Sequence, residues 1–591
     1  MNRRTTNLAS IGCVTLVAAL RVTLVAALVV GPVACSSDAP GAAESAPAAV
    51  SSPDPTQVTA PDTALETTPD SAPATGSNPV DSAVDGPACA APTTTTPVDA
   101  VEVAGSSVDI DVTSFDGTII RAHWFPVDGA TTARPAPTVL SGPGWGSGGD
   151  TNTSSAGPLG LVTIARLWDA GYNVLTWDPR GFGESTGTVT IDSPDYEGRD
   201  VQQLLDWLAT QPEAQLDAQR DPRVGMVGGS YGGAIQLVAA GLDCRVDAIV
   251  PTIAWHSLAT SLYKAEISKL GWASLLSAVS AGRSLDPNIP ESLVDSQTVG
   301  TLPAERADWF AQRGAPELVD DIREPTLLVQ GTVDTLFTLD EAVTNYTILR
   351  DNGVPTAMLW FCGGHGACLT DEGDRGRVAE VTLAWLDRYV RNDDSANTGS
   401  VFEVVDQHGD AFVADDYPQP TDTNTTVGTG TLRLVGDGGS GPAPAGANTD
   451  VISAFALGVT PARATNAANL TISVDDDSLF LGTPVLTLSY SGTVADGDRP
   501  TRVFAQLVDE ETGLVLGNQI TPIEVILDGA THEVTTPLEI IAHSGAAGSR
   551  LTLQIVATTV AYALPRLDGT ITFDEITIEL PIVTTMRPRT G

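Results

Sequence analysis

Short apolar runs alternate with amphipathic segments over much of this chain. Residues 108–115 and 118–126 alternate apolar and polar positions around Asp116 and Gly117, a pair typical of a hairpin turn. Residues 172–178 form a short, β-rich apolar run, which is typical of a buried strand. The pattern therefore predicts strands that begin at about residue 106.

Longer segments between these runs repeat apolar residues about every 3.6 positions. In residues 195–211, the positions Val201, Leu204 and Leu208 fall on one helical face, as expected for an amphipathic helix. Strands that alternate with helices predict a mostly parallel α/β sheet with helices packed on both faces.

The alternation stops twice, and these breaks divide the chain. Residues 252–324 contain helical segments without a strand pattern, so we expect an inserted helical cap. The α/β core would then comprise residues 101–251 and 325–395. The remaining residues, 396–591, contain strand-like segments separated by Gly, Asp and Pro turns, which predicts a C-terminal β-sandwich or jelly-roll domain.

Residues 1–34 have the composition of an export signal peptide, with two early arginines, a long apolar run and small residues at the end. Val33–Ser37 is similar to a bacterial lipoprotein site in which Cys35 becomes the lipidated N-terminus, although Pro32 stands where leucine is usual. Residues 35–100 are too polar to bury a core and predict a disordered tether. We expect an exported protein, either a cell-envelope lipoprotein or a secreted one.

The formal net charge of −43 narrows the classes of partner. Such an acidic chain is a poor match for nucleic acid or anionic membrane surfaces, so membrane contact is expected only through a lipid on Cys35. Lys264 and Lys269 are the two lysines among 591 residues. Mechanisms that need a phosphate-loop or Schiff-base lysine elsewhere are therefore excluded, and the cysteine spacing is not that of a zinc site.

The segment Gly228–Gly232 has the form G-x-S-x-G, with Ser230 at its centre. It lies directly between a predicted strand and a predicted helix, which is the context of a nucleophile elbow. In that context Ser230 is a candidate nucleophile, and the helix N-terminus would favour an oxyanion beside it. The other interpretation is a serine that only caps the helix.

A serine nucleophile of this kind needs an acid and then a base later in the chain. Asp334 follows a predicted strand and is the candidate acid, with Asp340 as its nearest competitor. His365 lies in a glycine-rich loop after the next strand and is the candidate base, with His256 as runner-up. The order Ser230, Asp334, His365 is that of α/β-hydrolases.

An oxyanion hole requires two backbone N–H groups near the nucleophile. The N–H of Tyr231, the residue after the candidate nucleophile, is the first. The second is expected in the loop after the predicted strand 136–142, where Pro143 has no N–H to offer. Trp145 is favoured for this role, and Gly144 is the alternative.

Two further features lie near the expected site. Trp255 follows a strand end at the start of the cap, so it is a candidate wall of an apolar substrate pocket, although core packing would explain it equally well. In the tight loop 178–187, Asp178 and Arg180 are expected to pair or to bond to the backbone rather than to take part in chemistry.

Export permits disulfide bonds, and Cys89, Cys244, Cys362 and Cys368 allow three pairings after the leader and Cys35 are set aside. We favour a bond between Cys362 and Cys368, because it would brace the loop between them. The alternative is a set of buried free thiols.

These motifs together resemble those of Xaa-Pro dipeptidyl-peptidase and cocaine-esterase type serine hydrolases. The resemblance extends over residues 105–590 and rests on DPRGFGES at 178–185, GGSYGG at 228–233, QGTVDTLF at 330–337 and GGHG at 363–366. It implies an α/β-hydrolase core with a cap and a C-terminal jelly-roll domain. It also implies hydrolysis of esters or amides through an acyl-enzyme, on a small-molecule ester, amide or short peptide, without cofactor or metal.

One departure from the family bears on specificity. Several members carry a tyrosine hydroxyl in the oxyanion loop, whereas this loop reads GPGWGSGG with Trp145 in it. The departure weakens the case for proline-specific peptidase activity and favours an esterase, with a dipeptidyl-peptidase as the alternative. A non-catalytic surface protein that binds partners through its β domain is the alternative from another class.

Overall fold

The computed structural model describes residues 100–102, 109–153, 161–436 and 463–589. The predicted signal peptide, nearly all of the tether and the candidate lipidation site Cys35 lie outside the described residues. Within the described ranges, no helix combines the length and hydrophobicity that crossing a membrane requires.

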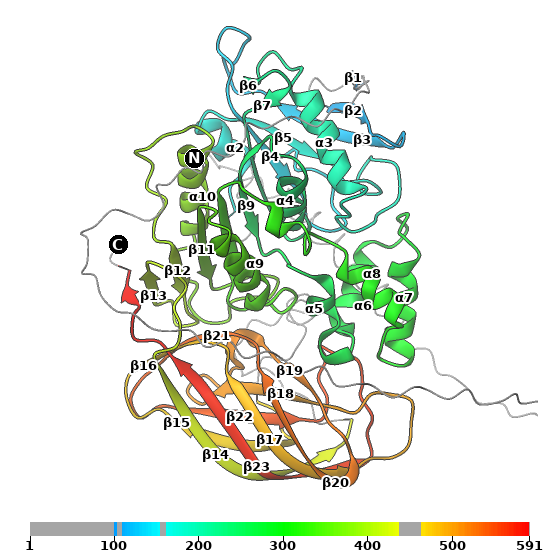
Figure 1. Ribbon diagram of the computed structural model, residues 1–591, viewed down its shortest axis with the longest axis vertical. Helices are drawn as coiled ribbons and strands as arrows, with labels where there is room; N and C mark the ends of the chain where they lie inside the picture. The colour runs from blue at the N-terminus through cyan, green and yellow to red at the C-terminus, as the bar shows by residue number, and fades with distance from the viewer. Residues whose placement is uncertain (1–99, 103–108, 154–160, 437–462, 590–591) are drawn as a thin grey trace, which may run out of the picture. The chain divides into compact units, whose positions relative to one another are not determined.

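A twelve-stranded sheet forms the scaffold of the first part of the described chain (Figure 1). Its seven central strands, β5, β4, β8, β9, β10, β11 and β12 in spatial order, run parallel. Antiparallel strands flank them at both edges. In spatial order the strands are β1 (Ala100–Glu102), β2 (Asp109–Thr113), β3 (Ile119–Phe125), β5 (Asn173–Trp177), β4 (Thr138–Gly142), β8 (Val224–Gly229), β9 (Val246–Thr252), β10 (Thr326–Gly331), β11 (Thr356–Phe361), β12 (Phe402–Val405), β13 (Ala411–Ala414) and β24 (Arg587–Pro588).

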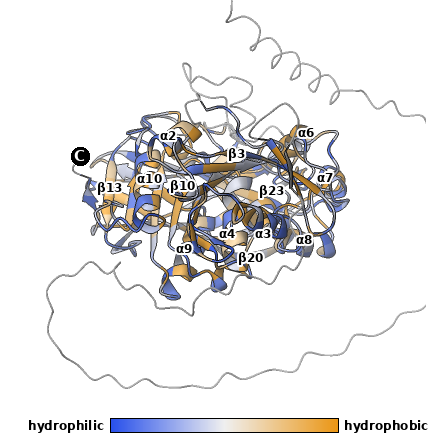
Figure 2. Ribbon diagram, turned by 90° about the horizontal axis from the view of Figure 1, so that it is seen from above, coloured by the Kyte–Doolittle hydropathy of each residue, from blue (hydrophilic) through white to orange (hydrophobic). Residues whose placement is uncertain are grey.

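Successive residues of the central strands face opposite sides of this sheet, as the two-residue period of a strand requires. Leu175 and Met226 pack in the core under α3, α4 and α9, whereas their neighbours Val174 and Val227 pack under α2 and α10. Hydrophobic colours concentrate on strands and helices, and the surrounding loops are largely hydrophilic (Figure 2). The helices are α2 (Ile164–Asp169), α3 (Glu197–Leu208), α4 (Tyr231–Leu242), α9 (Leu339–Asp351) and α10 (Arg377–Tyr389).

The cap lies between β9 and β10 in the chain, as the sequence predicts, and includes a helix that the sequence pattern did not reveal. Its α-helices are α5 (Leu258–Leu262), α6 (Leu270–Val279), α7 (Asn288–Thr298) and α8 (Ala304–Ala311), with 3-10 turns η2 (Lys264–Glu266) and η3 (Val319–Asp321). Helix α7 was missed because Pro290 interrupts its first turn. A proline is tolerated there, since the first N–H groups of a helix have no acceptor within it.

Two antiparallel sheets form the C-terminal β domain. Inward residues at every second position, such as Leu486 and Leu488 of one sheet and Leu551 and Leu553 of the other, share one core. The larger sheet contains β14 (Asp422–Leu434), β16 (Ser478–Gly482), β17 (Val485–Thr493), β20 (Asp528–Pro537), β21 (Ile541–Gly545) and β23 (Gly569–Ile582). The smaller contains β15 (Ala467–Ser473), β18 (Arg502–Asp509), β19 (Thr521–Glu524) and β22 (Arg550–Val556).

The C-terminal β domain was expected to begin at residue 396, but in the structure it begins at about residue 421. Strands β12 and β13 extend the first sheet beside β11, and β24 pairs with β13 at its edge. All four residues of β12 are buried. The boundary was placed where the helical pattern ends, but the end of the helices does not show which sheet the strands that follow will join.

Candidate active site

Ser230 occupies the sharp turn between β8 and α4. Its backbone angles, φ 59° and ψ −117°, lie in a region that residues with a side chain rarely adopt. The Ser230 N–H donates to the carbonyl of Thr252 at 2.9 Å, and its carbonyl accepts hydrogen bonds from the N–H groups of Gly233 and Ala234. These bonds hold the strained turn, which lifts the Ser230 hydroxyl above the end of the parallel sheet.

Gly232 allows the turn to pack directly against the end of β4. A Cβ at this position would lie 2.1 Å from the carbonyl oxygen of Gly142, a distance that no real side chain can occupy. The glycine after Ser230 is therefore required by close packing, and this packing brings the loop that follows β4 beside the candidate nucleophile.

The structure brings together the three side chains that the sequence nominated. His365 Nε2 lies 2.8 Å from Ser230 Oγ, and His365 Nδ1 lies 2.8 Å from Asp334 Oδ2. When the Nδ1–H donates to the carboxylate, Nε2 is left as an acceptor facing the hydroxyl. This arrangement suits removal of the hydroxyl proton by the imidazole.

The carboxylate of Asp334 is fully buried and held by main-chain donors. Its Oδ1 accepts from the N–H groups of Leu336 and Phe337 at 3.0 and 2.9 Å, and its Oδ2 accepts from the His365 N–H at 3.1 Å. A buried charge needs such partners. They also fix the direction in which the carboxylate meets the imidazole.

The imidazole of His365 is held by aromatic side chains and by a close approach of two loops. Phe337 and Trp272 pack edge-on to it, with ring centroids 5.1 and 5.7 Å away. A Cβ on Gly364, whose φ is +121°, would lie 2.6 Å from the Cβ of Asp334. The glycine before the histidine therefore lets the two loops meet.

The competing acid and base lie elsewhere. Asp340 is in the first turn of α9 and lies 3.9 Å from the Lys264 ammonium. His256 Nδ1 is 2.8 Å from Asn345 Oδ1. Among the described residues, the side-chain hydrogen bond of Ser230 is to His365 and to neither of these two.

The structure fixes the surroundings of both expected oxyanion donors. Tyr231 is the first residue of α4, so its N–H has no acceptor within the helix. The ring of Trp145 packs edge-on against Phe182 and Tyr231, and its indole N–H donates to the carbonyl of Leu276 at 3.0 Å. The loop of Trp145 is thereby anchored to cap helix α6.

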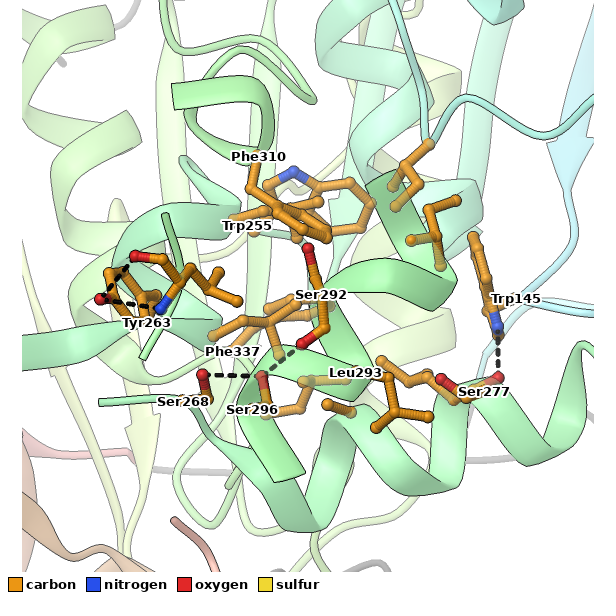
Figure 3. Close-up of a pocket in the computed structure, with 18 of the residues that line it drawn as sticks. Trp145, Trp255, Tyr263, Ser268, Ser277, Ser292, Leu293, Ser296, Phe310 and Phe337 are labelled. Atoms are coloured by element: carbon orange, nitrogen blue, oxygen red, sulfur yellow. Dashed lines mark hydrogen bonds between the residues drawn. The ribbon is translucent and has the colours of Figure 1, made fainter. Parts of the chain in front are cut away.

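An apolar cavity of about 90 Å³ opens at Ser230 and extends under the cap (Figure 3). Trp255 lines it, as one of the two sequence interpretations expected, and also packs against Phe337 with ring centroids 4.9 Å apart. Its indole N–H donates to the Arg313 carbonyl at 3.1 Å. Trp255 is thus a pocket wall and a core residue at once.

A disulfide joins Cys362 to Cys368, on either side of His365. It closes the loop that carries the imidazole, in the pairing that the sequence analysis favoured. Cys244 is disulfide-bonded too.

Asp178 and Arg180 have the structural contacts expected of them. The Asp178 carboxylate accepts from the N–H groups of Gly149 and Glu184, each at 2.7 Å. The Arg180 guanidinium donates twice to the Asp200 carboxylate, each time at 2.7 Å. These bonds tie the 178–187 loop to the loop after β4 and to α3.

Lys269, which sequence reasoning used only to exclude other mechanisms, braces the Asp334 loop from the cap. Its Nζ donates to the carbonyls of Thr335 and Leu336, each at 3.1 Å. Burial lowers the pKa of this ammonium to about 8. No local pattern marks the role, because the lysine is 66 and 67 positions from the two residues that it contacts.

Comparison with known proteins agrees with the motifs. Residues 116–367 match the model of the X-Pro dipeptidyl-peptidase family, S15. An uncharacterized 31.7 kDa protein from Escherichia coli is 32% identical over 167 residues, which cover 28% of this chain and 56% of that protein. The chain thus spans just over half the length of that curated relative.

Solved structures share the fold at low sequence identity. A CocE/NonD family hydrolase from Staphylococcus aureus has a TM-score of 0.60 at 12% identity, covering 80% of this chain and 93% of its own. An α-amino acid ester hydrolase has a TM-score of 0.57 at 13% identity, covering 83% and 99%. An aminopeptidase from a Thaumarchaeota archaeon has a TM-score of 0.57 at 15% identity, covering 85% and 100%.

The coverage by these structures includes the C-terminal β domain, so the shared fold is that of an α/β-hydrolase followed by a β domain. The resemblance expected from the motifs is confirmed: residues 116–367 match the model of the S15 family, and the solved structures share the fold.

Proposed function

We propose that this protein hydrolyses esters through an acyl-enzyme on Ser230. His365 removes the hydroxyl proton as Ser230 attacks the substrate carbonyl carbon, and then donates that proton to the leaving alcohol. A water molecule, deprotonated by the same imidazole, releases the acid and restores the serine. Asp334 orients the ring and stabilises its protonated form.

Two main-chain N–H groups would bind the oxyanion that forms at each step. Tyr231 is one, at the N-terminus of α4, where the helix dipole also favours negative charge. Trp145 is the second, with Gly144 as the alternative. Losing one such donor typically raises the barrier by about 2.7–4 kcal/mol.

The observation that carries the proposal is the hydrogen-bonded chain from Ser230 Oγ through His365 to Asp334. Ser230→Ala should abolish hydrolysis of a p-nitrophenyl ester without changing the far-ultraviolet circular dichroism. Retained turnover in that variant would refute the assignment. Failure of the wild-type protein to react with a fluorophosphonate probe would favour the non-catalytic surface protein instead.

The cavity favours an ester over a dipeptide as substrate. None of the described residues that line it is Asp, Glu, Lys, Arg or His. A dipeptidyl-peptidase must hold a free substrate ammonium, and burying that charge without a partner costs several kcal/mol. We therefore expect uncharged acyl esters to be hydrolysed much faster than Ala-Pro-p-nitroanilide, and the reverse order would favour the peptidase.

Export, with or without a lipid on Cys35, is part of the proposal and rests on the sequence of residues 1–37. Mass spectrometry of the mature protein tests it. An N-terminus at Cys35 with a diacylglycerol mass supports the lipoprotein, whereas an unmodified N-terminus near this position supports secretion. An intact N-terminus at Met1 would contradict both.

A further inference from the structure

Among the described residues that line the cavity at Ser230, one has a fully buried polar group without a hydrogen-bond partner. Most of the cavity wall is apolar, and its remaining polar side chains are hydroxyls. Several of these already have partners. Tyr263 Oη accepts from the Leu302 N–H at 3.1 Å, and Ser296 Oγ bonds to Ser268 Oγ at 2.8 Å.

Ser292 differs from Ser296, its neighbour one turn along α7. A buried serine in a helix commonly returns its hydroxyl to the carbonyl four residues earlier. Ser296 does so, with its Oγ 2.7 Å from the Ser292 carbonyl oxygen. Ser292 is 6% exposed, and its Oγ has no hydrogen-bond partner among the described residues.

A buried hydroxyl without a partner costs about 1–3 kcal/mol, so its presence in a substrate cavity calls for a reason. In Figure 3 the Ser292 hydroxyl points away from Ser296, to the side of the pocket where Trp255 and Phe310 lie. A bound molecule that places an oxygen there would satisfy it. The surrounding wall is suited only to uncharged, apolar atoms.

We propose that Ser292 is a specificity-determining residue, which selects a short, uncharged substrate chain carrying one hydrogen-bonding oxygen within an otherwise apolar stretch. This inference rests on the proposed ester hydrolysis at Ser230. The cavity of about 90 Å³ is smaller than the roughly 150 Å³ apolar cavity that accommodates benzene, so the chain is short. Ser292 is placed to donate to an ether or carbonyl oxygen on it, or to accept from a hydroxyl.

Isosteric esters that differ by one oxygen test the inference. p-Nitrophenyl pentanoate is compared with p-nitrophenyl ethoxyacetate and p-nitrophenyl methoxypropionate, which vary the acyl chain. Pentyl acetate is compared with ethoxyethyl acetate, which varies the alcohol. Each kcat/KM is expressed as the ratio of wild type to Ser292→Ala for the same ester, so that intrinsic reactivity cancels.

The ratio should be about five for at least one ether ester. It should be one or less for the all-carbon esters, because the variant no longer buries an unsatisfied hydroxyl. The series in which the effect occurs identifies which part of the ester enters the cavity. Ser296→Ala is the matched control. It loses a hydrogen bond within the protein, so it should change the kcat/KM of every ester by the same factor.

A binding measurement separates this inference from the proposed chemistry. In the Ser230→Ala background, calorimetry should give a lower Kd for the ether ester than for its all-carbon partner, and Ser292→Ala should remove the difference. If the enzyme is active and Ser292→Ala changes the kcat/KM of all esters by the same factor, this inference is overturned but the proposed function is not. A wild-type protein inert to every ester and to fluorophosphonate would overturn the proposed function and this inference with it.

Discussion

Gln519 of the C-terminal β domain donates a hydrogen bond to the main-chain carbonyl of Asp334 at 2.5 Å. Beside it, the Asn518 side chain reaches the carbonyl of Ala367, two residues after His365, at 3.4 Å. The β domain therefore contacts the loops of both the acid and the base. We therefore expect the β domain to help position the acid and the base, independent of any binding function of its own.

Replacing Gln519 should lower turnover more than substrate binding, because Gln519 contacts the acid loop but does not line the cavity. Gln519→Met removes one hydrogen bond, and we expect kcat to fall about fivefold with KM nearly unchanged. Gln519→Glu should lower kcat further near neutral pH, since its carboxylate would face a carbonyl oxygen. Steady-state kinetics with both variants would contradict this role if KM alone changed.

The Cys362–Cys368 disulfide should support catalysis through the loop that it closes. Cys368→Ser leaves that loop free to move, so we expect a several-fold lower kcat and a modestly lower melting temperature. Peptide mapping without reduction checks that the bond forms in the wild-type protein. Equal kcat in the wild type, before and after mild reduction, would show that the loop needs no such support.

The close contact between Gly232 and Gly142 predicts a severe effect of a single methyl group. Gly232→Ala should shift the nucleophile turn, lower stability by about 1–3 kcal/mol and remove most ester hydrolysis. Gly144→Ala is the matched control, because a Cβ there meets no atom within 4 Å and the N–H is retained. Thermal unfolding and kinetics of the two variants together check the packing argument.

Lys269 should make the stability of the protein depend on pH in the alkaline range. Burial lowers its pKa from 10.5 to about 8. Between these values the unfolded chain binds a proton that the folded protein does not, so the free energy of unfolding rises with pH. The full contribution across this window is on the order of 3 kcal/mol.

Urea unfolding of the wild type and Lys269→Met across pH 8–10.5 isolates this contribution, since other titrating groups are common to both. The difference in unfolding free energy, wild type minus variant, should increase with pH. A difference that is constant or decreases over this range would mean that Lys269 keeps its proton in the folded protein.

Local sequence patterns were sufficient for the alternating strands and helices, the cap position and the nomination of Ser230, Asp334 and His365. Each of these depends on neighbours a few positions away: a glycine-flanked serine between a strand and a helix, or a histidine in a loop after a strand. The order of the three along the chain favoured His365 over His256, which precedes the acid. Asp340 was ranked below Asp334 because the sequence pattern places it at the start of a helix.

Only the tertiary structure decided which sheet each late strand joins and what surrounds the nominated residues. Strands β12 and β13 are only four residues long, and the sheet that each joins depends on long-range pairing. The bracing of the Asp334 loop by Lys269 and Gln519, and the unsatisfied hydroxyl of Ser292, likewise arise between segments distant in sequence. Such contacts follow from how the segments pack against one another, which no local pattern records.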